Sequence, residues 1–336
     1  MPDLVEAFRA HCADQQRVAP SLLLAVHVPR ICSVLAFIDA EPSAEHTKRN
    51  IERIFRVANW MIDPKMFQTF VQLIGEAQFW KMANERGVKL DRIPERKNEM
   101  TPDFRLSDVS GLSPCFEVKT LSVVDGEFNL ARMDEASFEA QLSLRAQVGA
   151  GRAVASATAS ASPHGVVENC KTMTMIIRNL VKKAENNIKP GQFANAPTLL
   201  VLNLMLLDGY YNGKGSLRPV TCIHGSDWQL RSGAYWNLAF GQPGHLVFGL
   251  PEFEGKPGVE GSLDCEGILS AHPEICALLL IVHDWEAEPK IYGLAREVDT
   301  DRWLSDLKPL GDAFLKLAGE NWNDDRDTLG WRLTDK

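Results

Sequence analysis

The sequence predicts an α/β protein in which a mixed central sheet is flanked by helices, with a helical layer before the sheet and an extension after it. Residues 66–86 and 169–188 have apolar positions at helical spacing, and residues 102–120 alternate between polar and apolar. The second helical stretch is followed by an unbroken apolar run of strand length at residues 198–207. We expect an N-terminal helical layer, a core and a C-terminal extension packed on the core. Their expected bounds are 1–62, 63–208 and 209–336.

The N-terminal layer and the first core helix are predicted from periodicity and from helix boundary signals. Ile51, Ile54 and Phe55 belong to an apolar series at three- and four-residue spacing. Pro64 is a favourable residue for the first turn of the next helix, and Gly87 is a favourable residue just beyond its end. The chain therefore enters the core through a helix at about residues 66–86, and a strand is expected near residues 88–93.

The stretch 102–120 predicts a β-hairpin. Its two halves alternate in polarity, with Phe104 and Phe116 among the apolar positions that face a core. The turn is expected around Ser110. Because successive side chains of a strand point to opposite faces, the charged residues of both halves share the other face of the hairpin. These residues are Asp103, Arg105, Glu117 and Lys119.

The rest of the chain is expected to complete the sheet and then to extend it. The helix at 169–188 and the strand at 198–207 belong to the predicted core. Residues 209–267 are rich in Gly, Pro and aromatics and predict loops with short strands. A second buried strand is expected at residues 277–283, before a helical and acidic C-terminus.

Composition limits the class of protein and its compartment. The formal net charge of -8 excludes a protein that coats nucleic acid through bulk positive charge, so any such binding needs a local patch. The seven cysteines are scattered and include no C-x-x-C pair, which favours a reducing interior over a disulfide framework. With no signal-like or membrane-spanning pattern in these residues, we expect a cytoplasmic protein without a membrane partner.

The charged face of the hairpin contains a candidate metal site. A turn centred on Ser110 places Asp103 opposite Glu117, with Cβ atoms roughly 4.5–5.5 Å apart. Two carboxylates this close repel each other unless a cation lies between them, and Mg²⁺ prefers carboxylate oxygens. Lys119 shares their face, where it can orient a water or offset charge on a phosphate. The alternative is a solvated hairpin face held by cross-strand ion pairs.

These residues resemble a known family. The string T-P-D-F at 101–104, followed after the hairpin turn by F-E-V-K-T at 116–120, is similar to the motif of the PD-(D/E)XK nuclease superfamily, the restriction-endonuclease-like nucleases. The expected order of elements agrees, because that core consists of a helix, a three-stranded meander, a second helix and a further strand beside the meander. The resemblance spans about residues 66–207 and implies a restriction-endonuclease-like core.

The resemblance implies roles for individual residues. Asp103, Glu117 and the main-chain carbonyl of Val118 would hold Mg²⁺ or Mn²⁺, and Lys119 would activate or position a water. The string I-G-E-A at 74–77 is similar to the family's first-helix pattern, which assigns Glu76 to the metal site or its water shell. A solvated helix residue is the alternative for Glu76. The glutamine that relatives carry on the second helix is absent at the end of the helix at 169–188.

The activity implied is metal-dependent phosphodiester hydrolysis of DNA by an endonuclease. Double-stranded DNA is the expected partner, and Arg178, Lys182 and Lys183 on the second helix are the residues expected to contact its phosphates. A homodimer is one assembly that the sequence allows. Two alternatives stay open: a ribonuclease, and a non-catalytic module of the same fold that binds nucleic acid or protein.

Other signals in the sequence are weaker. The glycine-rich stretch at 209–216 lacks the Walker spacing, and the pairs Cys222 with His224 and His272 with Cys276 match no standard zinc site. A cluster of aromatic residues could stack on bases but is more often packed in a core. These aromatic residues are Trp228, Tyr235, Trp236 and Phe240.

Overall fold

The chain forms two compact units. The first comprises Met1–Ile74 and Asp125–Val167, and the second comprises Gly75–Val124 and Glu168–Lys336. These units divide the chain differently from the three segments expected from the sequence. The computed structural model describes residues 3–14, 20–57, 64–94, 100–107, 109, 113–121, 131–157, 172–204, 221–224, 229–248, 259–282, 289–303 and 306–326.

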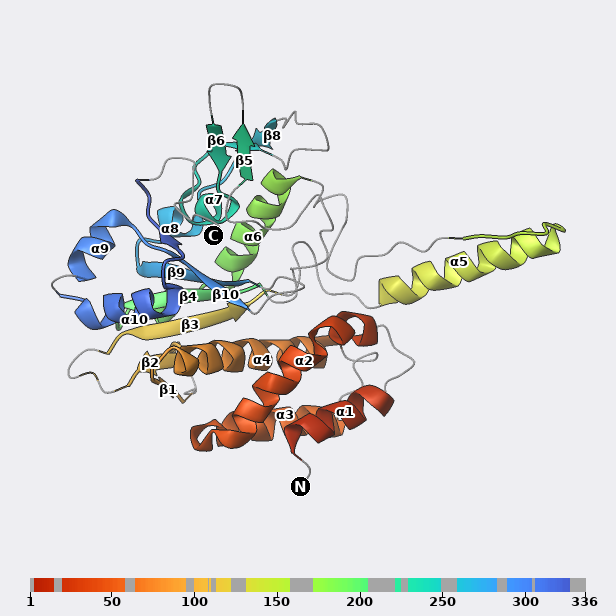
Figure 1. The fold of residues 1–336 in the computed structure, drawn as a ribbon, viewed down its shortest axis with the longest axis horizontal. Coiled ribbons are helices and arrows are strands. Elements are labelled where there is room, and N and C mark those ends of the chain that lie inside the picture. The colour runs from red at the N-terminus through yellow and green to blue at the C-terminus, as the bar shows by residue number, and fades with distance from the viewer. Residues whose placement is uncertain are drawn as a thin grey trace. The chain divides into compact units, whose positions relative to one another are not determined.

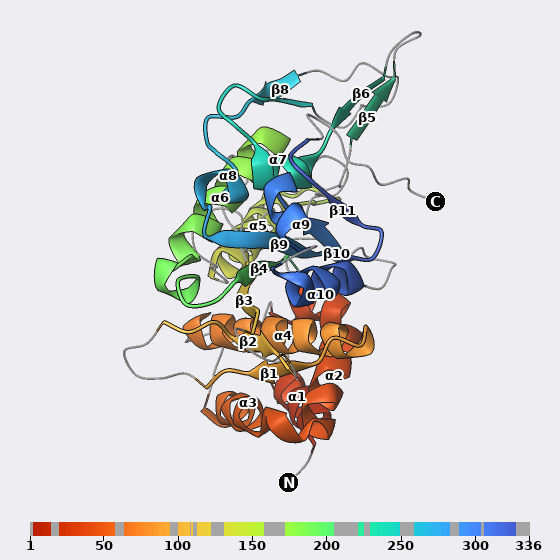
Figure 2. The ribbon, with the colours of Figure 1, turned by 90° about the vertical axis from the view of Figure 1, so that its left-hand side faces the viewer.

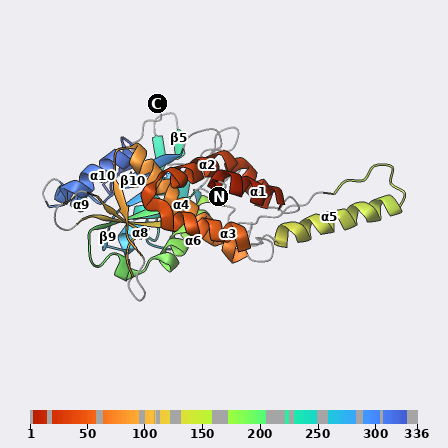
Figure 3. The same ribbon diagram turned by 90° about the horizontal axis from the view of Figure 1, so that it is seen from below.

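The first unit is helical, as the sequence predicted for the N-terminal region. Its helices are α1 (Leu4–Asp14), α2 (Pro20–Ala40), α3 (Glu45–Val57), α5 (Ala131–Gly149) and the first part of α4 (Pro64–Glu85). Helices α1, α2 and α3 lie side by side (Figures 1 and 3). The rings of Phe8, Phe55 and Phe70 pack with centroids 5.5–6.0 Å apart. None of the helices in the described ranges has the length and apolar character needed to cross a membrane.

The second unit is built on a mixed sheet of seven strands, in the order β1-β2-β3-β4-β9-β10-β11 (Figure 2). The strands are β1 (Leu90–Arg92), β2 (Phe104–Leu106), β3 (Cys115–Thr120), β4 (Thr198–Asn203), β9 (Ile275–Val282), β10 (Lys290–Leu294) and β11 (Trp322–Asn323). Strands β1, β2 and β3 form the predicted antiparallel meander, and β4 pairs parallel to β3. The expected order of core elements is therefore observed.

Helices cover both faces of this sheet (Figure 1). On one face, Phe79 of α4 contacts the rings of Phe104 and Phe116, and Phe314 of α10 (Lys308–Ala318) lies against Gly293. On the other face, one buried apolar cluster joins the inner strands to α6 (Met173–Asn187), α7 (Ala234–Phe240) and α8 (Ile268–Ala271). The second unit is thus a three-layer α/β/α arrangement, as expected for strands that are buried on both faces.

The C-terminal third contains the short strands, the buried strand and the helices that the sequence predicted, and it also extends the sheet. The sheet continues through β9, β10 and β11, so the expected boundary between residues 208 and 209 does not end the sheet. Strand β10 and helix α7 were not expected from the sequence. Two short hairpins also form here: β5 (Thr221–His224) with β6 (Gln229–Ser232), and β7 (Leu246–Phe248) with β8 (Val259–Ser262).

Candidate functional site

The hairpin has the predicted register, because Phe104 pairs with Phe116 and Arg105 pairs with Cys115. Asp103 comes just before β2, and its N–H donates to the Phe116 carbonyl at 3.1 Å. Phe104 and Phe116 are buried on the α4 side, so the alternation of β3 places Glu117 on the other face. The centre of the predicted turn lies outside the described residues.

The Asp103 carboxylate is fixed by the main chain of β3. Its Oδ2 accepts a hydrogen bond from the Val118 N–H at 2.8 Å. This contact lies just before the start of β2, beside Pro102, which has no N–H to donate to β3. The N–H and C=O of a strand residue point to the same edge of the strand. The Val118 carbonyl therefore lies on the edge of β3 that Asp103 approaches.

Glu117 is the most buried charged side chain of the site. It is 1% exposed, and its Oε1 accepts from both Lys119 Nζ and Gln192 Nε2, the latter at 2.5 Å. Its Oε2 is buried and has no hydrogen-bond partner among the described residues. A buried carboxylate oxygen without a donor is costly, because its hydration is lost without replacement.

Burial and mutual repulsion change the protonation of the carboxylates. Burial and, to a smaller extent, the negative charge of Asp103 together raise the pKa of Glu117 to about 7, against the opposing effects of Lys119 and Gln192. Burial also raises the pKa of Glu76 to about 8, and Asp103 again contributes. Glu76 and Glu117 are thus both harder to ionise than they would be alone, and Asp103 contributes to both shifts.

Glu76 lies on α4, which approaches β3 closely. A Cβ at Gly75 would lie 1.9 Å from Thr120 Oγ1, so glycine is needed for this approach. The Glu76 carboxylate forms an ion pair with Arg92, with 2.7 Å between Oε2 and Nη2. Among the described residues, no three or more His, Cys, Asp or Glu side chains are grouped to hold a metal ion. A role for Glu76 as a third ligand therefore stays a prediction.

The oxygen ligands that are left when Glu76 is set aside fit a divalent cation. They are two carboxylates and one main-chain carbonyl, from Asp103, Glu117 and Val118, all of them hard oxygen ligands of the kind that Mg²⁺ takes. The partnerless Oε2 of Glu117 and the raised pKa of this residue are both features that a cation would relieve. Lys119 shares the face of Glu117, as predicted, and its side chain is 19% exposed.

Gln192 is a site residue that the sequence did not reveal. Helix α6 ends at Asn187, and Gln192 closes the short 3-10 turn Pro190–Gln192 that follows. The turn brings its buried amide to Glu117, 75 residues away in sequence. The end of α6 itself has no such glutamine, because the side chain that reaches Glu117 comes from the turn that follows the helix.

The basic residues of α6 differ in how they are engaged. Arg178 forms an ion pair with Asp264 at 3.4 Å, Lys182 is exposed, and Lys183 is half-buried. Their apolar helix neighbours Ile176, Ile177 and Leu180 are buried, so the helix is amphipathic as predicted. Binding of nucleic acid by these three basic residues stays a prediction.

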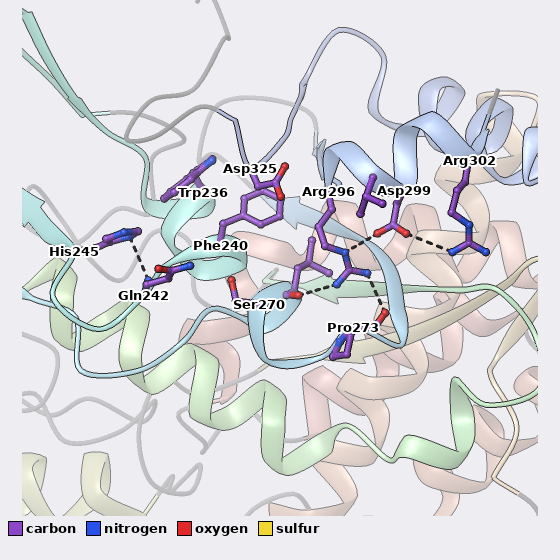
Figure 4. Close-up of a pocket in the computed structure, with 12 residues that line it drawn as sticks. Trp236, Phe240, Gln242, His245, Ser270, Pro273, Arg296, Asp299, Arg302 and Asp325 are labelled. Carbon is purple, nitrogen blue, oxygen red and sulfur yellow. Dashed lines mark hydrogen bonds and ion pairs between the residues drawn. The ribbon is translucent and has the colours of Figure 1, made fainter. Parts of the chain in front are cut away.

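A separate cavity of about 720 Å³ lies among α7, α8 and α9 (Glu297–Trp303) in the second unit (Figure 4). Arg296 on its wall donates to Asp299 Oδ2 at 2.6 Å and to the Leu269 carbonyl at 2.8 Å, so its charge is used to hold neighbouring chain segments. Trp236 and Phe240 are buried, as expected for aromatic residues that pack in a core and do not stack on bases. The cavity is therefore a weaker candidate site than the hairpin.

Of the possible zinc ligands, the described pair His272 and Cys276 belongs to no group of three or more His, Cys, Asp or Glu side chains that could hold a metal ion. His272 pairs with Glu274 at 2.9 Å, and burial raises the pKa of the Cys276 thiol. A thiol with a raised pKa is a poor metal ligand at neutral pH. The side chains of Cys222 and His224, like the glycine-rich stretch at 209–216, lie outside the part of the chain that is described.

Fold and site together define an α/β protein whose mixed seven-stranded sheet presents a buried and a half-buried carboxylate beside a lysine. Comparison with protein families, with curated proteins and with solved structures finds no match to this chain. Function is therefore argued from the site.

Proposed function

We propose that the second unit is a Mg²⁺- or Mn²⁺-dependent phosphodiesterase that cuts DNA as an endonuclease, with a PD-(D/E)XK type of site. The observation that carries the proposal is the approach of the Asp103 carboxylate to Val118 on β3, next to Glu117, whose Oε2 is buried without a donor among the described residues and whose Oε1 pairs with Lys119. A purely structural carboxylate pair has no need of an oxygen that is buried without a donor.

In this proposal Asp103, Glu117 and the Val118 carbonyl would hold the cation. A bound Mg²⁺ would offset the charge of the phosphate and lower the pKa of a water. Hydrolysis then joins the water oxygen to phosphorus while one ester P–O bond breaks, and the departing oxygen takes up a proton. Lys119 would orient the water or stabilise the charge that develops on the phosphate.

The chain contributes further constraints to this site. The Val118 N–H fixes the orientation of Asp103, and the Gln192 amide fixes that of Glu117. Such restraint lowers the cost of arranging ligands when the cation and the substrate arrive. The basic residues Arg178, Lys182 and Lys183 are the proposed phosphate contacts along α6, which suits a protein of negative net charge that binds DNA through one local patch.

One observation favours the alternative of a non-catalytic binding module. The carboxylates Glu117 and Glu76 are both engaged by cationic side chains of the chain itself, Lys119 and Arg92. A site closed by its own ion pairs can persist without a metal ion. Such a module would bind nucleic acid or protein without cutting it.

Cleavage assays separate the two functions. Purified protein is incubated with plasmid, linear duplex, single-stranded DNA and RNA, in Mg²⁺, Mn²⁺ or chelator. We expect DNA cleavage that requires a cation and falls by about a hundredfold or more in Asp103→Asn and Lys119→Met. The control is Asp91→Asn, because Asp91 is an exposed carboxylate of β1 that pairs with Arg105 at 3.4 Å and accepts a hydrogen bond from the Ser107 hydroxyl at 2.9 Å. Cleavage that survives both site variants contradicts the proposal, and binding without cleavage supports the module.

A further inference from the structure

The turn that follows α6 begins with a cation that the proposed function does not yet use. Lys189 precedes Pro190, and a residue in this position is restricted to extended conformations. Its φ of -112° and ψ of 114° agree with that restriction. Lys189 is exposed, and its side chain forms no ion pair or hydrogen bond with another described residue. Its ammonium group is therefore available to a ligand.

The turn is anchored to the candidate site in two places. The Gln192 amide donates to Glu117 Oε1 at 2.5 Å, and the Gln192 N–H donates to the Lys189 carbonyl at 2.9 Å. The turn also packs on Met100, because a Cβ added at Gly191 would lie 3.1 Å from its Cβ and its Sδ. The main chain of Lys189 is therefore held in a fixed position beside the site.

The turn lies on the face of the sheet that carries Glu117 and Lys119. These two residues pair with Leu200 and Leu202 of the neighbouring strand β4, and paired residues of a parallel ladder point to the same face. Leu200 and Leu202 belong to the buried apolar cluster that includes α6, whereas α4 covers the opposite face. Because α6 leads directly into the turn, Lys189 and the proposed metal site share one face of the sheet.

The charges already assigned to the site leave the neighbouring phosphates of a DNA strand without a partner. A divalent ion and Lys119 would together balance Asp103, Glu117 and the phosphate that is cut. A strand carries one phosphate for every ~3.4 Å of helix axis, so further phosphates pass close to the site. The ends of a 3-10 turn are only about 6 Å apart, so Lys189 starts about two phosphate spacings from Gln192 and the site.

We propose that Lys189 binds a phosphate that flanks the one that is cut, from the same turn that orients Glu117. The inference rests on the proposed phosphodiesterase function and adds a substrate contact to it. Lys189 does not touch the reacting atoms, so it acts on the affinity for DNA and on the position of the strand. A lysine ammonium acts here as a compact point charge, and arginine at the same position would keep that charge.

Binding measurements test the contact without relying on cleavage. The anisotropy of a fluorescein-labelled DNA duplex of about 20 base pairs is followed in chelator and in Ca²⁺, at several salt concentrations. We expect Lys189→Met to weaken binding by about fivefold and to lower the slope of log K against log salt by about one, because one phosphate contact is lost. Lys189→Arg should retain the affinity and the slope.

The matched control is Lys316→Met. Lys316 is an exposed lysine of α10, which covers the opposite face of the sheet together with α4, so this variant removes the same charge far from the proposed strand. We expect it to bind DNA as the wild-type protein does. Thermal unfolding of each variant checks that the fold is retained.

A second measurement locates the contact on the strand. Cut positions are mapped on a labelled duplex, and a neutral methylphosphonate then replaces one phosphate at a time on either side of the cut. For the wild-type protein we expect one such replacement to raise KM by about fivefold with little change in kcat. Lys189→Met should be insensitive to that same replacement, whereas Lys316→Met should respond as the wild-type protein does. A lysine with a merely structural role would show no such coupling.

The possible outcomes separate this inference from the proposed function. If the wild-type protein cuts DNA but Lys189→Met and Lys316→Met bind it alike, the role of Lys189 is overturned and the phosphodiesterase stands. If Lys189→Met binds weakly but stays sensitive to every methylphosphonate, its place beside the cut is overturned. If nothing is cut but only Lys189→Met loses affinity and salt slope, the phosphate contact stands and the catalytic proposal fails. If the protein neither binds nor cuts DNA, both are overturned.

Discussion

Replacing Glu117 with glutamine removes the ionisable group from the most buried carboxylate of the site, so it should change how stability depends on pH. In the folded protein the pKa of Glu117 is raised from 4.5 to about 7, chiefly by burial. The carboxyl therefore binds its proton more tightly when folded than when unfolded. Its contribution to stability is fully present below about pH 4.5 and is lost as the pH rises through about 7.

The size of this effect follows from the shift. Each pKa unit corresponds to about 1.4 kcal/mol, so the Glu117 shift amounts to on the order of 3 kcal/mol between pH 4.5 and pH 8. Glutamine has a similar shape and can still accept from Lys119 and Gln192, but it does not titrate. The free energy of unfolding of Glu117→Gln minus that of the wild-type protein should therefore rise by this amount across that range.

Urea unfolding of both proteins at pH 5, 6, 7 and 8, in chelator, measures the difference. The same series in Mg²⁺ tests the metal site, because a cation bound by the ionised carboxylates competes with the proton. We expect Mg²⁺ to stabilise the wild-type protein more at pH 8 than at pH 6 and to have little effect on Glu117→Gln. A difference between the two proteins that stays flat with pH would refute the argument that burial suppresses ionisation of Glu117.

Two further variants test the packing and the orientation of the site. Gly75→Ala should lower the free energy of unfolding in urea by about 1–3 kcal/mol, because the added Cβ would lie 1.9 Å from Thr120 Oγ1. Gly149→Ala is the control, because an added Cβ there has no neighbour within 4 Å and should not destabilise the protein. Equal effects of the two glycine variants would contradict the close approach of α4. Gln192→Leu removes a hydrogen-bond donor that favours the ionised form of Glu117. The onset of Mg²⁺-dependent stabilisation, measured by thermal unfolding at each pH, should therefore move to higher pH. An unchanged onset would mean that this hydrogen bond does not affect the ionisation of Glu117.

The parts of the fold that could be predicted from the sequence are those specified by local patterns. Gly87 adopts a positive φ of 70° two residues after the end of α4, as its place beyond a periodic stretch indicated. The hairpin register follows from alternation on either side of a short turn, so Phe104 pairs with Phe116 as predicted. Each of these features is set by residues that lie close together in the sequence.

The parts that were missed depend on tertiary contacts. All seven residues of α7 are buried, so Ala234–Phe240 shows no alternation between a polar and an apolar face and gives no helical period to detect. Gly293 weakens the strand signal of β10, yet a Cβ there would meet Phe314 at 2.4 Å, so packing against α10 requires glycine. Gln192 and Arg92 reach the site across 75 and 16 residues, from positions with no local signature.

The site can be neutralised in two ways, and the difference between them decides what it does. In the first, Lys119 and Arg92 pair with Glu117 and Glu76, and Glu117 Oε2 is left without a donor among the described residues. In the second, which we propose, a divalent ion would be held by Asp103, Glu117 and the Val118 carbonyl, and Lys119 would be available to a phosphate. A binding module needs only the first arrangement, whereas hydrolysis of a phosphodiester needs the second. The first arrangement leaves a buried carboxylate oxygen without a hydrogen bond, so a cation that binds this oxygen recovers the free energy that the missing bond costs. The pH dependence of the stabilisation by Mg²⁺ measures that gain.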